Sequence, residues 1–175
     1  QILRHRRADQ PTLHRLAPYR LRVDPASVVA YLDHEHAAPV PRDDRDRRRG
    51  LAGRALDELQ PDCVLIATGS EVALAMDAAK GLAEQGRSVR VVSMPCTDLF
   101  DTQPKQYRDS VLPPGVPAVA IEAGVRDGWW RYVSSGGAVI GMDSFGASAP
   151  AKELFAHFGF TRDNVIRTVQ GLLKS

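Results

Sequence analysis

Apolar and polar blocks alternate along residues 59–175 in an order that predicts strands and helices in turn. Four short apolar runs end in turn-forming residues, as is typical of strands buried on both faces. They lie within PDCVLIATGS (61–70), RSVRVVSMP (87–95), VPAVAIEAG (116–124) and AVIGMDSFG (138–146). Helix-forming or turn segments separate them. This alternation predicts an α/β fold with three layers, in which a mostly parallel sheet is flanked by helices.

The segment after the first strand predicts an amphipathic helix. Residues 70–86 place Glu71 in a first helical turn and Gly86 at a stop, and one face carries Val72, Ala75, Ala79 and Leu82. Residues 97–113 predict a turn and a short helix with Pro104 in its first turn, and either Asp101 or Thr102 as its cap.

The end of the chain carries start and stop signals for two helices. Ser148 is expected to cap the first helix, with Pro150 in its first turn, and Gly159 is expected to end it. Thr161 is expected to cap the last helix. The predicted buried stripe of that helix contains Val165, Ile166, Val169 and Leu172 or Leu173.

Composition places the chain among soluble globular proteins. It has 175 residues, of which 43% are hydrophobic and 25% charged. Its apolar runs are too short to span a bilayer, and no secretory signal is visible, so we expect no membrane partner and a cytoplasmic location. Cys63 and Cys96 lack metal-ligand spacing, and Cys63 is predicted to be a buried thiol.

Residues 1–58 differ in character from residues 59–175. The first 50 residues contain eleven Arg, no Lys and seven acidic residues, with prolines that interrupt any helix. They predict an irregular or disordered segment. Its basic stretch RDDRDRRRG (42–50) contains three Asp and no aromatic residue, so a solvated charge run is favoured over a nucleic-acid site.

Two segments lie where an α/β sheet places ligands. ATGSE (67–71) joins a strand to a helix, where backbone N–H groups can hold an anion, but a tight turn with a helix cap is the favoured interpretation. Glu122 ends the third strand at the same predicted edge. A structural role for Glu122 is favoured, in which it caps a helix or pairs with Arg126 or Arg131, because no second catalytic group is visible beside it.

The remaining candidates have simpler explanations. His157 lies near a helix C-terminus, where the helix dipole favours an imidazolium, and no partner suggests a general base. His34 and His36 lack a third metal ligand. Trp129 and Trp130 point about 100° apart on a helix, so one is expected in the core and the other at the surface. No complete catalytic, cofactor-binding or metal-binding set emerges.

Longer segments resemble one family. ATGSEV, VVSMP.TD.FD.Q, YR.SVLP, EAG...W..YV and FG.SAPA..LF..FGFT.DNV together resemble the C-terminal domain of transketolase from about Gln60 to Leu173. The resemblance implies a fragment of a homodimeric enzyme of the pentose phosphate pathway or Calvin cycle. Such enzymes move a two-carbon ketol group between sugar phosphates, using thiamine diphosphate and a divalent cation (Mg²⁺, with Ca²⁺, Mn²⁺ or Co²⁺ as alternatives).

The resemblance transfers no site residue to this chain. The family's cofactor and sugar-phosphate residues lie in earlier domains, so this chain is expected to bind no cofactor and to be inactive alone. Residues 1–58 depart from the family pattern, and one hypothesis is a reading-frame shift that ends near residue 58; a divergent extension is the other. The alternative function is a free-standing α/β module that binds a partner protein or a small anion at the ATGSE and IEAG edge.

Overall fold

The computed structural model describes residues 19–23, 30–34, 60–133 and 135–174. In this described part, one sheet has the strand order β1-β2-β4-β3-β5-β6. Its parallel strands are β3 (Cys63–Ala67), β4 (Val89–Ser93), β5 (Ala118–Val125) and β6 (Ala138–Met142). Strands β1 (Tyr19–Val23) and β2 (Ala30–His34) continue it in antiparallel pairing beyond β4. The prediction of a mostly parallel sheet is confirmed.

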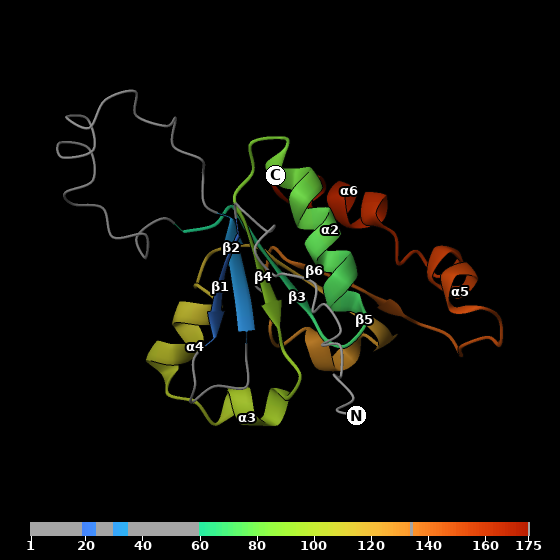
Figure 1. Cartoon of the computed structure of the whole chain (residues 1–175). Coiled ribbons are helices and arrows are strands. Elements are labelled where there is room, and N and C mark those ends of the chain that lie inside the picture. Colours follow the sequence, from blue (N-terminus) through green and yellow to red (C-terminus); the bar gives the residue numbers. More distant parts are fainter. Residues whose placement is uncertain (1–18, 24–29, 35–59, 134, 175) are drawn as a thin grey trace, which may run out of the picture.

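Helices cover both faces of the sheet. Figure 1 shows α2 (Glu71–Ala83) and α6 (Arg162–Leu172) side by side on one face. The other face packs against α3 (Thr97–Asp101), α4 (Lys105–Val111) and the short 3-10 helix η2 (Asp127–Trp129). The last helix before α6 is α5 (Ala151–His157), which has no fully buried residue and lies at the margin of the domain (Figure 1).

The apolar run of β3 has residues in both layers of the core. Cys63, Leu65 and Ala67 pack on the side of α2 and α6, whereas Val64 and Ile66 pack on the side of α3, α4 and η2. Successive side chains of a strand point to opposite faces, so a strand covered on both sides must be apolar throughout. Complete burial of a side chain such as Leu65 contributes about 1.5–3 kcal/mol.

Several predicted helix boundaries are confirmed. Gly86 and Gly159 have φ angles of 76° and 82°, a left-handed conformation that glycine adopts without steric strain at the end of a helix. Thr161 caps α6, since its Oγ1 accepts a hydrogen bond of 3.3 Å from the Asn164 N–H group. Val165 and Val169 of α6 are buried, as predicted.

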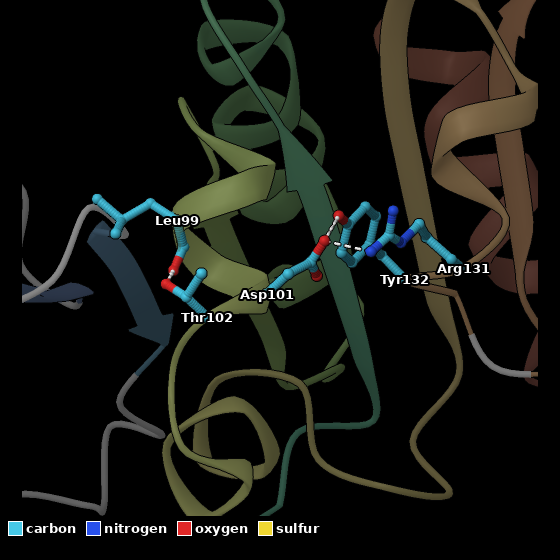
Figure 2. Close-up of polar contacts among 5 residues, drawn as sticks. All are labelled: Leu99, Asp101, Thr102, Arg131 and Tyr132. Atoms are coloured by element: carbon cyan, nitrogen blue, oxygen red, sulfur yellow. Dashed lines mark hydrogen bonds and ion pairs between the residues drawn. The ribbon is translucent and has the colours of Figure 1, made fainter.

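Two predicted caps are wrong. Helix α5 begins after Pro150 and α4 after Pro104, and neither N-cap proline has a side chain that can accept a hydrogen bond. Ser148 is exposed, two residues before the N-cap. Thr102 instead donates a 2.8 Å hydrogen bond to the Leu99 carbonyl (Figure 2). Each proline is extended, with ψ near 140°, so its own backbone sets where the helix begins.

Candidate functional site

The structure brings the two predicted ligand segments to one edge of the sheet. Ala67, the last residue of β3, pairs with Ile121 of β5, so the turn 68–70 and Glu122 follow at neighbouring positions. Helix α2 begins at Glu71 directly after the turn. Gly69 has a φ angle of 54°, which indicates the tight turn that the simpler explanation of ATGSE requires.

This edge carries two interacting carboxyl groups. Glu71 is only 5% exposed and accepts a 3.2 Å hydrogen bond from the Ser70 hydroxyl. Glu122 is half-buried, and its Oε2 atom is shielded from solvent without a hydrogen-bond partner among the described residues. Burial, and then the charge of Glu71, raise the pKa of Glu122 above its ordinary value. The edge is therefore acidic.

An acidic edge does not suit thiamine diphosphate. The Glu71 N–H group already bonds to the Thr68 carbonyl, and two carboxyl groups oppose a bound diphosphate. In the part of the chain that the structure describes, no three His, Cys, Asp or Glu side chains are grouped so that they could hold a metal ion. The described residues thus do not fit the cofactor and cation that the family resemblance implies.

The arginines near Glu122 have other partners. Arg126 Nη1 lies 2.7 Å from Asp143 Oδ2, and Arg131 pairs with Asp101. The predicted pairing of Glu122 with Arg126 or Arg131 is therefore wrong. Asp143 follows the end of β6, and Asp101 ends α3, so both partners come from elements that are distant in the sequence.

The remaining candidate residues are His157, the two tryptophans, His34 and His36. His157 is exposed at the end of α5, with its ring centroid 4.8 Å from that of Phe158. Trp129 is buried and Trp130 is 47% exposed beneath the Arg126 guanidinium, which confirms the predicted division of the two tryptophans. His34 ends β2, and His36 and the basic stretch 42–50 lie outside the described residues.

Cys63 is buried as predicted. Its side chain is fully shielded from solvent, and burial, followed by the charge of Asp62, raises the pKa of the thiol to about 12. Because the thiolate is the reactive form of cysteine, Cys63 is inert in the folded chain. Cys96 is half-buried.

A polar cluster that the sequence did not indicate joins α3 to the segment after η2. Figure 2 shows Asp101 Oδ2 accepting hydrogen bonds from the Tyr132 hydroxyl, at 2.9 Å, and from the Arg131 guanidinium. Burial, and then the hydrogen bond to Asp101 and its charge, raise the pKa of Tyr132. Asp101 lies 30 positions or more from its partners, and no spacing rule connects residues so far apart.

Comparison with known proteins assigns the chain to a protein family. A family model described as the transketolase-like TK C-terminal domain matches residues 54–161. The chain belongs to the transketolase C-terminal domain family. Its sequence is similar to transketolase 2 of Aliivibrio fischeri, with 57% identity over 117 residues that make up 66% of this chain and 18% of the relative.

Solved transketolase structures share the same architecture. The transketolase of Leishmania mexicana has 52% identity and a TM-score of 0.62 over 66% of this chain and 17% of its own. That of Pichia stipitis in complex with sedoheptulose-7-phosphate has 39% identity and a TM-score of 0.62 over 67% of this chain and 17% of its own. The chain thus spans under a fifth of the length of the transketolases that it matches.

Proposed function

We propose that this chain serves as the C-terminal domain of an active transketolase. That enzyme transfers a two-carbon ketol group from a ketose phosphate, such as xylulose 5-phosphate or sedoheptulose 7-phosphate, to an aldose phosphate, such as ribose 5-phosphate or glyceraldehyde 3-phosphate. The family match over residues 54–161 carries the proposal. The Pichia stipitis complex with sedoheptulose-7-phosphate supports the choice of substrate class.

In this proposal, domains outside the chain hold thiamine diphosphate and its divalent cation. When bound, thiamine diphosphate supplies the carbanion chemistry that ketol transfer requires. The present residues support that site without forming it, because their sheet edge carries Glu71 and Glu122. For the same reason, binding of a small anion at this edge by a free-standing module is disfavoured.

Exposed apolar side chains support a docking role beside that edge. Phe145 is 99% exposed, Val125 is 73% exposed and Trp130 is 47% exposed, and they lie at or after the ends of β5 and β6. Large apolar side chains clustered at a surface favour contact with another protein surface. We assign them to the contact with the remaining domains and with the second subunit of a cytoplasmic homodimer. The pathway, pentose phosphate or Calvin cycle, stays open.

Ketol transfer from xylulose 5-phosphate to ribose 5-phosphate tests the proposal directly. The assay is run with thiamine diphosphate and Mg²⁺ on the 175-residue chain and on the product of the complete gene. We expect transfer only by the complete product, since the present residues do not form the cofactor site. A matched sample without thiamine diphosphate controls for contaminating activity.

Different results would contradict the two parts of the proposal, which are the location of the cofactor site and the transketolase activity. Ketol transfer by the 175-residue chain alone would place the cofactor site within these residues. An inactive complete gene product that nevertheless binds thiamine diphosphate would remove the assignment of transketolase activity.

A further inference from the structure

A cavity of about 370 Å³ lies at the amino ends of β3 and β5, beneath α3 and α4. Val64 and Ala118, which are paired in the sheet, contribute to its lining. The other lining residues come from α3, from α4 and the turn that follows it, and from the segment after η2. The cavity therefore lies over the face of the sheet that α3, α4 and η2 cover, and neither Glu71 nor Glu122 is among its described lining residues.

Part of the cavity lining is apolar, and three of its apolar or aromatic residues, Phe100, Val116 and Tyr132, are buried. Phe100, Leu112, Val116 and the Tyr132 ring contribute to its lining. The hydrogen bond to Asp101 fixes the Tyr132 ring, and Phe100 packs against it edge to face with ring centroids 6.0 Å apart (Figure 2). A volume of this size lies within the range of small-molecule sites, about 300–1,000 Å³, which are mostly apolar with a few polar groups.

The charged groups around the cavity leave one cation without a partner. Lys105 pairs with Asp109, and Arg131 pairs with Asp101. Arg108 lies between these pairs in the lining, and its Nε atom is shielded from water with no acceptor among the described residues. The same part of the chain offers the Arg108 guanidinium no ion pair. Among the described residues, the lining therefore has three cations against two carboxylates.

We propose that this cavity is a binding site for a small organic anion with an apolar body and a phosphate or carboxylate group. The apolar body packs against Phe100, Leu112 and Tyr132, and the anionic group accepts hydrogen bonds from Arg108. The planar guanidinium offers two parallel N–H groups that match the oxygens of either anion. This binding proposal does not rest on the proposed ketol-transfer activity.

Binding is tested with three probes of increasing complementarity to the cavity. Phenol supplies the apolar body, inorganic phosphate supplies the anion, and phenyl phosphate supplies both. Titrations of the 175-residue chain are followed by ¹H–¹⁵N correlation spectra, in which Gly115 and Val116 report on the cavity and Gly171 on a distant surface. We expect phenyl phosphate to shift the cavity signals and to bind at least about tenfold more tightly than either partial probe.

Variants of Arg108 separate a specific site from general attraction to positive charge. Arg108→Met should weaken phenyl phosphate binding by about tenfold or more, because it removes a charge-assisted hydrogen bond. Arg108→Lys keeps the charge but loses the planar fork, so we expect a smaller loss. Arg167→Met, at an exposed position on α6, is the matched control and should bind like the unmodified chain.

The proposal is overturned if phenyl phosphate shifts signals outside the cavity only, or if Arg108→Met and Arg167→Met bind it equally well. Equal affinities for phenyl phosphate and inorganic phosphate would also overturn it, because the apolar lining would then play no part. If Arg108→Met does not fold, Arg108→Lys decides the question by the same titration: unchanged affinity contradicts the role of the guanidinium.

Discussion

Arg162, the first residue of α6, lies directly over Gly81 in α2. A Cβ atom added at Gly81 would be 2.5 Å from Arg162 Nη2 and 2.8 Å from the Cδ1 atom of Ile166. From this position the guanidinium lies 3.7 Å from an Asp77 carboxylate oxygen and 3.8 Å from one of Glu84. The absence of a side chain at Gly81 therefore allows the close contact between α2 and α6.

Gly81→Ala should distinguish the effect of this contact on stability from the effect of helix propensity. Alanine favours a helix over glycine by about 1 kcal/mol, but crowding a packed interface costs about 1–3 kcal/mol. Gly171→Ala in α6 is the matched control, because a Cβ there has no atom within 4 Å. In urea unfolding, Gly171→Ala should be slightly more stable than the unmodified chain. Gly81→Ala should be less stable than Gly171→Ala, because the ends of the Arg162 and Ile166 side chains must shift to make room for the Cβ atom. Equal stabilities of the two variants would contradict the close contact.

Two tyrosines on the same face of the sheet should respond differently to loss of the hydroxyl. Tyr132 donates to Asp101, whereas the buried Tyr107 hydroxyl has no hydrogen-bond partner among the described residues. At pH 7, Tyr132→Phe should lower the free energy of unfolding by about 1–2 kcal/mol, since it removes a hydrogen bond to a carboxylate. Tyr107→Phe should be neutral or stabilising. The reverse order of the two variants in urea unfolding would refute this account of the cluster.

Glu122 should make the chain less stable as the pH rises. Its pKa in the folded chain lies above the ordinary value of 4.5, so the folded chain binds more protons than the unfolded chain between the two pKa values. The free energy of unfolding therefore decreases as the pH rises through that window and stays lower above it.

Glu122→Gln tests this pH dependence, because glutamine cannot ionise. The variant should be more stable than the unmodified chain at pH 7, and the difference should shrink below pH 4.5, the ordinary value for the carboxyl group. Thermal unfolding across this range measures the effect. Glu153→Gln, which removes an exposed carboxylate on α5, should show no comparable gain. An advantage of Glu122→Gln that grows toward low pH would contradict the assigned cause.

The two cysteines should differ in reactivity. Cys63 is fully buried with a pKa of about 12, and Cys96 is half-buried, so a disulfide reagent such as DTNB should modify one thiol per folded chain. The Cys96→Ser chain should react only as fast as it opens or unfolds, and both thiols of the unmodified chain should react in urea. Rapid modification of native Cys96→Ser would show that β3 is less protected than the structure indicates.

The sequence predicts the features of this domain that depend on neighbouring residues. The apolar runs, the glycine stops at Gly86 and Gly159 and the Thr161 cap all depend on conformational preferences within a few residues. The segments that reach the carboxyl edge, with Glu122, could also be predicted, because parallel strands bring their ends together. The predicted caps at Ser148 and at Asp101 or Thr102 are wrong because a proline begins each helix. Asp101 instead bonds a partner that is distant in the sequence.

The cavity beside Arg108 could not be predicted in the same way. Its lining combines the start of β3, α4 and the segment after η2, which meet only when the sheet and its helices are assembled. Arg108 in the sequence resembles any surface arginine of a short helix. That its Nε atom has no acceptor among the described residues, while Lys105 and Arg131 are paired with carboxylates, emerges only in three dimensions.

The pairing of β2 with β4 has a practical consequence for producing this domain. Residues 30–33 lie before the family-matched range 54–161, yet they pair with Arg90–Ser93 along one side of β4. A shortened chain that begins at residue 54 would leave the peptide groups on that side of β4 without partners, in a form that readily recruits strands from other molecules. Truncation limits chosen from sequence similarity alone would thus favour aggregation, and expression should start upstream of Tyr19.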